Sequence, residues 1–246
     1  MLEILSQIKT DISKLDRRAI AALVYAAAGL TGIFYLKKPE VADAFFGVNS
    51  FSNPADNNLK SLVWWVGIVT IFYFIIPAAI VKFHWKADLK DFGLQFSIEN
   101  GFWKVLAGCV ALMLPLTYLM SLTSGFAAKY PFLQIYNGEP YIGQTLLIWE
   151  LIYFLQFFGL EFFFRGFLVH SLKPSLGLYS IFVMTVPYCM IHFGKPPAET
   201  IAAIVAGIFL GWLSYRNGSI WIGLILHCTV AFSMDILALF NKGLLI

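Results

Sequence analysis

The sequence predicts an all-α membrane protein, a polytopic bundle of about seven transmembrane helices. Of the 246 residues, 59% are apolar and only 13% are charged, whereas soluble domains have roughly 45–50% apolar and about 25% charged residues. The charged residues lie in short stretches between apolar runs that are long enough to cross a bilayer. The net charge of +3 is spread over many connections, so no basic patch indicates nucleic-acid binding.

Residues 1–18 predict an amphipathic helix that lies on the membrane surface, ahead of the first span. Leu5, Ile8, Ile12 and Leu15 recur at helical spacing, with charged side chains between them. A short solvated helix docked on the bundle fits the same pattern equally well. The charges leave no early apolar core, so we expect no cleavable signal peptide.

Seven apolar runs predict the spans. The fourth run is the longest and carries Glu150, Glu161 and Arg165, so we expect part of it to protrude, bend or tilt. The partly apolar stretch 41–52 leaves an eighth or re-entrant element open. The predicted spans cover residues 19–36, 61–82, 102–122, 143–172, 176–193, 199–216 and 219–240.

Lysine and arginine orient the spans, because these residues are enriched in cytoplasmic loops. Their balance predicts a cytoplasmic N-terminus in a cell membrane and, with seven spans, a C-terminus on the outer side. The residues assigned to the cytoplasmic side are Lys9, Lys14, Arg17, Arg18, Lys82, Lys86 and Lys90, against Lys37, Lys38, Lys60, Lys129 and Lys195 on the other side.

The chain is predicted to form one integral membrane domain over residues 1–246, since its polar connections are too short for a second, soluble domain. On the sixth span, Ala203, Gly207 and Gly211 recur every four residues, which lets a neighbouring helix approach closely. Pro187 removes a helical hydrogen bond from the fifth span and opens space inside the bundle.

Four ionisable residues lie inside the predicted spans of the second half, namely Glu161, Arg165, His192 and His227. Each costs roughly 2.5–3.5 kcal/mol on insertion unless it is paired or hydrated. Glu161 and Arg165 are four residues apart and therefore share one helix face, where they can pair. A purely structural salt bridge is one interpretation of these two residues.

The depths of the other polar residues favour a functional interpretation. Counted at about 1.5 Å per residue from one membrane side, Glu161 lies roughly 16 Å deep, His192 roughly 24 Å and His227 roughly 12 Å. Three residues from three spans thus converge on a middle layer. A carboxylate that accepts a proton, an imidazole that orients water and a donor for an oxyanion are the groups needed to hydrolyse a carbonyl compound.

Three segments carry a resemblance to a known family. Residues 161–167 (EFFFRGF) resemble the first motif of the CPBP family, the CAAX-protease and bacteriocin-processing intramembrane proteases, usually written EExxxR. Residues 188–192 (YCMIH) are similar to the second motif, an aromatic residue followed by xxxH. Residues 227–231 (HCTVA) resemble the third, HxxxN. The motifs occur in order on successive predicted spans.

The resemblance covers roughly residues 90–240, and the stretch 91–94 (DFGL) looks like a short segment upstream in the same family. It implies a membrane helix bundle with a protease site in this core. In the family, paired glutamates and the second-motif histidine activate water without an obligatory metal. The third-motif histidine and asparagine bind the oxyanion.

Carried over by position, Glu161 matches the second glutamate of the first motif and Arg165 its arginine. His192 and His227 match the two histidines. The resemblance therefore implies Glu161, His192 and His227 as catalytic residues, with Arg165 and Tyr188 in support.

Two positions depart from the family pattern. The first glutamate is replaced by Leu160, and the asparagine by Ala231, which cannot donate a hydrogen bond from its side chain. Glu161 can serve as the base if the helix is rotated or locally unwound. Oxyanion stabilisation then has to come from His227, a backbone N–H or Tyr188.

Three functions follow. The first is an intramembrane endopeptidase that needs no cofactor and cleaves a membrane-associated protein or peptide, with or without an attached lipid. The second is a non-proteolytic family member that acts as a binding or chaperone-like scaffold. The third is a small transporter, or a zinc-dependent hydrolase with Glu161, His192 and His227 as ligands; Asp235 lies two turns beyond His227 and is a poor partner for such a site.

Overall fold

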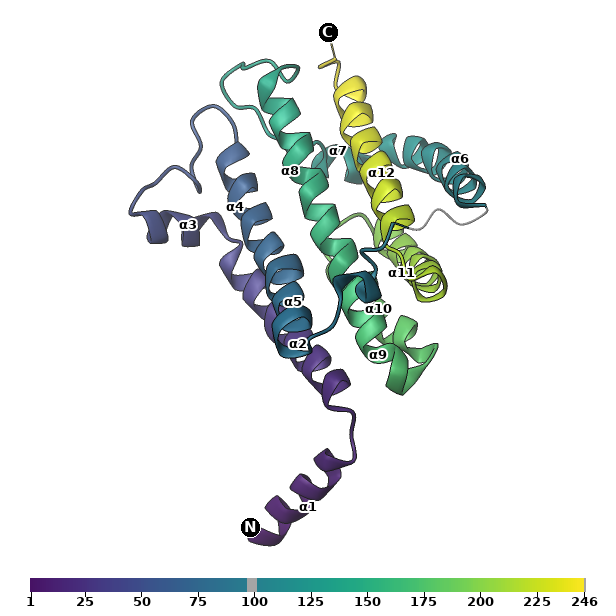
Figure 1. Cartoon of the computed structure of the whole chain (residues 1–246). Helices are drawn as coiled ribbons and strands as arrows, with labels where there is room; N and C mark the ends of the chain where they lie inside the picture. Colours follow the sequence, from purple (N-terminus) through teal and green to yellow (C-terminus); the bar gives the residue numbers. More distant parts are fainter. Residues whose placement is uncertain (97–100, 246) are drawn as a thin grey trace.

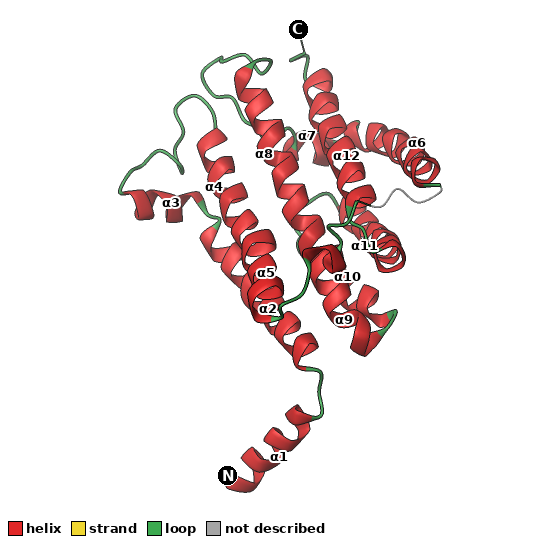
Figure 2. Ribbon diagram, in the orientation of Figure 1, coloured by secondary structure: helices red, strands yellow, loops and turns green. Residues whose placement is uncertain are grey.

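The computed structural model describes residues 1–96 and 101–245, and every regular element in them is helical (Figure 2). This confirms the predicted fold class. Six helical stretches are long and apolar enough to cross a membrane. They are α2 (Arg17–Leu36), Leu59–His84, α6 (Phe102–Ser121), Gln144–Leu176, α11 (Pro197–Asn217) and α12 (Trp221–Asn241).

The fifth predicted span is shorter than expected. Residues 176–193 were predicted to be helical, but the helix α10 covers only Tyr179–Met190. A twelve-residue helix is shorter than the hydrocarbon core is thick. The backbone leaves the helix through a turn that contains Gly194 at φ +89°. Within the described residues the bundle therefore has six full-length spans and one short apolar helix.

No eighth span forms in the described residues near 41–52. This region holds α3 (Pro39–Phe46), which has eight residues and ends at Gly47 in the left-handed conformation. A helix of this length covers about 12 Å, well short of the bilayer. Two other short elements lie outside the spans, a 3-10 turn η3 (Leu89–Phe92) and α7 (Ser124–Lys129).

Two of the spans contain wider π-helical segments. In the second span, α4 (Leu59–Thr70) continues through η1 (Ile71–Ile75), α5 (Ile76–Ala79) and η2 (Ile80–His84). In the fourth span, α8 (Gln144–Glu161) continues through η4 (Phe162–Leu168) into α9 (Val169–Leu176). π-segments inside helices are rare and are frequently associated with functional sites.

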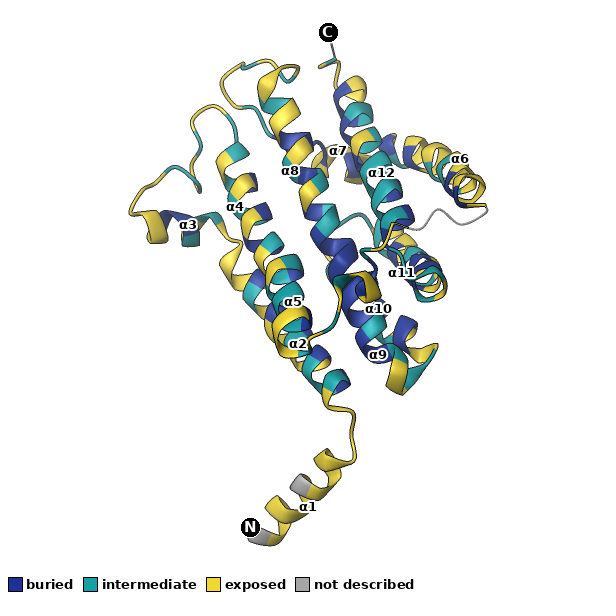
Figure 3. Cartoon of the chain, viewed as in Figure 1, coloured by how far each residue is buried: buried dark blue, intermediate teal, exposed yellow. Residues whose placement is uncertain are grey.

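The segment η4 lies at the centre of the core. Phe162, Phe163, Phe164 and Phe167 have no exposed surface, and η4 contacts α2, α5, α10 and α11. Figure 3 shows the buried residues concentrated on the lower half of α8 and its continuation. α8 itself lies between α4 and α12 (Figure 1).

The stretch 91–94 packs against η4. A side chain at Gly166 would overlap the carbonyl oxygen of Phe92, so this close approach requires glycine. The backbone N–H of Ile220, just before α12, donates to the carbonyl of Gly93 at 3.1 Å. The segment thus connects η4 to the start of α12.

The predicted small-residue face of the sixth span is confirmed. A methyl group at Gly207 would lie 3.0 Å from both Thr185 and Tyr188 of α10, and one at Gly211 would lie 2.8 Å from Met184. The absence of side chains lets α10 and α11 approach closely. This contact holds Tyr188 against the bundle interior.

The predicted N-terminal helix forms as α1 (Leu2–Ser13) and extends away from the bundle (Figure 1). Its residues Leu5, Ile8 and Ile12 are exposed. The apolar face packs against no other part of the described chain, so docking on the bundle is not observed. Its location at the membrane surface and the cytoplasmic orientation of the N-terminus remain predictions.

A buried carboxylate organises the loop after α3. Asp43 accepts hydrogen bonds from the backbone N–H groups of Ser50, Phe51 and Ser52, each at 2.9 Å, and from the Ser52 hydroxyl. These donors lower the pKa of Asp43 from 3.8 to about 2, and the Ser52 hydroxyl has the largest effect.

We expect Asp43→Asn to lower the melting temperature at neutral pH. The variant should also lose the part of the pH dependence of stability that comes from the Asp43 carboxylate. The pKa is lower in the folded state, so the stabilising contribution is present above the unfolded value and is lost as the pH falls through about 2. Wild type and variant should therefore converge in thermal unfolding between about pH 5 and pH 2. Glu40→Gln, an exposed change on the same helix, is the control. An equal difference between Asp43→Asn and wild type at every pH would contradict this prediction.

Candidate functional site

A fully buried ion pair occupies the centre of the candidate site. Glu161 is the last residue of α8 and Arg165 lies in η4, and neither side chain has exposed surface. Oε1 of Glu161 and a terminal guanidinium nitrogen of Arg165 are 3.2 Å apart. The predicted pairing is therefore present. Because a buried charge is costly alone, each residue depends on the other.

His227 joins this pair from α12. Its Nδ1 lies 2.8 Å from Oε1 of Glu161 and 3.1 Å from the carbonyl oxygen of Gly223. Both neighbours are acceptors, so we assign the ring proton to Nδ1. Nε2 is 3.0 Å from the hydroxyl of Tyr188, which therefore donates to it. The His227 side chain keeps 18% of its surface exposed.

Tyr188 connects Arg165 to His227. The guanidinium carbon of Arg165 lies 3.8 Å from the centroid of the Tyr188 ring, a close cation–π contact. Tyr188 is only 1% exposed and packs edge-on against Phe164 of η4. The contacts from Glu161 to His227, from His227 to Tyr188, from Tyr188 to Arg165 and from Arg165 back to Glu161 thus form a closed ring inside an aromatic core.

His192 lies beside this ring and not within it. The sequence places it in a membrane helix, but the structure places it in the turn after α10. Its Nδ1 donates to the carbonyl of Tyr188 at 2.9 Å, and the two rings are 4.9 Å apart. In the described chain no hydrogen bond or ion pair joins it to Glu161 or His227. Its Nε2 is left without a protein partner there, on a half-buried side chain.

The side chains at the two positions that depart from the family pattern are buried among apolar neighbours. Leu160 is 5% exposed and belongs to the main apolar core. Ala231 is 4% exposed and packs with Trp149 and Tyr153 of α8. Aromatic side chains therefore occupy the space that the motif's asparagine would face.

Gly223 is a site residue that the sequence analysis missed. It lies one turn before His227 on α12, and a side chain there would overlap the carboxylate of Glu161. Its carbonyl also accepts from His227. A small residue four positions before a histidine in an apolar run is the only sequence signal for this role, and such spacing is common in membrane helices.

Gly223→Ala is therefore expected to displace the Glu161 carboxylate and to lower stability by about 1–3 kcal/mol. The comparison is with Gly67→Ala on α4, where a methyl group meets nothing within 4 Å and alanine should be neutral or slightly stabilising. Thermal unfolding of the two purified variants in the same detergent measures the difference. Equal melting temperatures would show that α12 moves aside without cost.

The predicted zinc ligands do not fit a metal site. Both ring nitrogens of His227 face protein groups, and the ring of His192 contacts Tyr188. A catalytic zinc needs three protein ligands that point at one centre. Over the described ranges no group of three or more His, Cys, Asp or Glu side chains is suitably arranged.

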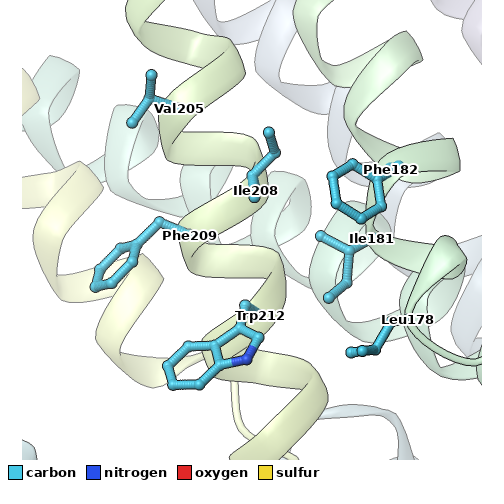
Figure 4. A pocket seen from close by; sticks show the side chains of 7 residues that line it. All are labelled: Leu178, Ile181, Phe182, Val205, Ile208, Phe209 and Trp212. Carbon is cyan, nitrogen blue, oxygen red and sulfur yellow. The ribbon is translucent and has the colours of Figure 1, made fainter.

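An apolar cavity of about 390 Å³ lies away from the polar cluster, between α10 and α11 (Figure 4). Its lining has no ionisable side chain, so it offers no group for hydrolysis. It lies on the same two helices that position Tyr188. The lining residues are Leu178, Ile181, Phe182, Val205, Ile208, Phe209 and Trp212.

Comparison with known proteins bears on this cluster. Residues 142–233 match the family model described as type II CAAX prenyl endopeptidase Rce1-like. The match includes Glu161, Arg165, His192 and His227, and lies inside the range over which the sequence resembles the CPBP family. No match was found among curated proteins or among solved structures.

Proposed function

From the premise that residues 142–233 form an Rce1-like domain of the CAAX-protease type, we propose that this protein is an intramembrane endopeptidase. It hydrolyses a peptide bond of a membrane-associated protein or peptide with water activated by Glu161, His192 and His227. One observation carries the proposal: a fully buried glutamate contacts a histidine from another span, beside a second histidine with a free ring nitrogen.

The free nitrogen leaves His192 able to accept a proton from water without giving up a contact to the protein. Its Nδ1 proton is held by the Tyr188 carbonyl, so Nε2 carries a lone pair, and the side chain is only half-buried. A general base must lie within hydrogen-bond reach of the water that it deprotonates. The sequence analysis gave proton acceptance to Glu161, which here has no exposed surface and is paired with Arg165.

Glu161 then acts through His227. Its carboxylate lies against Nδ1 and favours the tautomer with the proton on that nitrogen. The Tyr188 hydroxyl and the His227 ring form one hydrogen-bonded unit, and the Tyr188 O–H has to turn away from Nε2 of His227 to donate to the oxyanion of the attacked carbonyl. Once turned, the Tyr188 hydroxyl supplies the hydrogen-bond donor that the side chain of Ala231 lacks.

A scaffold without proteolytic activity is the second candidate. Leu160 and Ala231 favour it, because both positions are taken up by apolar packing. The fully buried Glu161–Arg165 pair fits this function as a structural element of the bundle. The two candidates differ in one respect, whether peptide bonds are broken.

The experiment compares protein termini in cells that express wild type, His192→Ala or His84→Ala. His84 is an exposed histidine at the end of the second span and serves as the matched control. New termini in wild type and His84→Ala, absent from His192→Ala, support the protease and identify its substrate. Identical profiles from three variants that accumulate equally in the membrane would reject it in favour of the scaffold.

A further inference from the structure

Two buried acidic residues lie where α8 and α12 pack together, away from Glu161. Glu150 on α8 is 6% exposed and Asp235 on α12 has no exposed surface. The two carboxyl groups face each other closely enough to hydrogen-bond if a proton lies between them. Figure 1 shows the two helices running side by side.

The donors around the pair are distributed unequally. Asp235 accepts from the indole N–H of Trp149 at 2.8 Å, and the backbone N–H of Phe132 faces the same carboxylate. Both oxygens of Glu150 lack a partner, as does the second oxygen of Asp235. Buried carboxyl oxygens without a donor are costly, and a proton shared between the two carboxyl groups lowers that cost.

The surroundings exclude a neutralising side chain. In the described chain no lysine, arginine or histidine lies within ion-pair distance of either carboxylate. Two carboxylates also supply too few ligands for Ca²⁺, which takes six to eight oxygens. The other titratable groups near the pair are Tyr130, Tyr153 and Cys228.

We propose that Glu150 and Asp235 form a proton-binding site, in which neutral Glu150 donates a hydrogen bond to ionised Asp235. The proton gives Glu150 a donor role and gives the second oxygen of Asp235 its missing partner. It also removes one of two like charges from a dry interface. Asp235 keeps the charge because the indole of Trp149 and the Phe132 amide stabilise it.

The acid pair fixes α12 against α8 at a distance from the polar cluster. Trp149, Tyr153 and Phe157 form a ladder along α8, with successive ring centroids 4.5 and 4.6 Å apart. Phe157 stacks on the ring of His227 at 5.3 Å. Stacked aromatic groups therefore lead from the acid pair to His227, and the pair positions that histidine.

The test uses Glu150→Gln, which imitates a neutral carboxylic acid, and Glu150→Leu, which removes the donor at similar size. Expected results are a melting temperature near that of wild type for the glutamine variant and a decrease of several degrees for the leucine variant. Infrared spectra of wild type should contain the carbonyl band of a protonated carboxylic acid, and Glu150→Gln should lack it.

Two outcomes would overturn the proposal. One is a wild-type spectrum without a band that depends on Glu150. The other is stabilisation of wild type, but not of Glu150→Gln, by added Na⁺ or Ca²⁺, which would assign the site to a cation. The effect of the pair on cleavage rests on the proposed function, whereas the infrared and melting measurements do not. The infrared and melting measurements can therefore reject the proton-binding site without bearing on the proposed protease activity, and the cleavage assay can reject the protease without bearing on the proton-binding site.

Discussion

Arg165→Met is expected to lower the free energy of unfolding by about 3–5 kcal/mol, because it leaves Glu161 as a buried charge without its cation. Both side chains of the pair have no exposed surface, so water cannot replace the lost partner. The guanidinium contact with the Tyr188 ring is lost at the same time. Thermal or chemical unfolding of the purified protein in detergent measures the loss.

The matched control for this change is Arg216→Met on α11, whose side chain is exposed and should cost no more than about 1 kcal/mol. The double variant Glu161→Gln with Arg165→Met should recover part of the stability, because no charge then remains unpaired. A single Arg165→Met variant as stable as Arg216→Met would contradict the assignment of the pair as buried and interdependent.

His192→Ala is expected to lower kcat for peptide cleavage by roughly 10²–10⁴-fold, the usual contribution of a general base. KM and the melting temperature should change little, because His192 is half-buried and its one hydrogen bond goes to the Tyr188 carbonyl. His84→Ala should retain wild-type rates. Equal losses of kcat and thermal stability in His192→Ala would indicate instead that the ring supports the fold around Tyr188.

The parts of the fold that follow from local composition could be predicted. Six spans were found from apolar runs alone, and the pairing of Glu161 with Arg165 follows from their four-residue spacing. Depth counting brought Glu161 and His227 to one layer, and the structure places them 2.8 Å apart. The spans and the depth of their polar residues can be predicted from sequence because the bilayer fixes where each helix begins and ends.

Features that depend on packing between distant segments could not be predicted. The Phe92 carbonyl lies close to Gly166 of η4, a contact between segments that are far apart in the sequence. Because α10 ends at Met190, His192 lies in the turn that follows and not in the predicted helix. The contact between Glu150 and Asp235 joins residues far apart in the chain. Hydropathy cannot reveal which polar side chains meet across an interface.

Reconstitution tests the central claim most directly. Purified wild type, His192→Ala and His84→Ala are placed in lipid nanodiscs with a mixed library of peptides from membrane proteins, in water enriched in ¹⁸O. Mass spectrometry then reads the new C-termini. The proposed mechanism predicts cleaved peptides with ¹⁸O in the new carboxyl group for wild type and His84→Ala, and their loss in His192→Ala. Folded wild-type protein that yields no ¹⁸O-labelled termini, or equal labelling by His192→Ala, would contradict it.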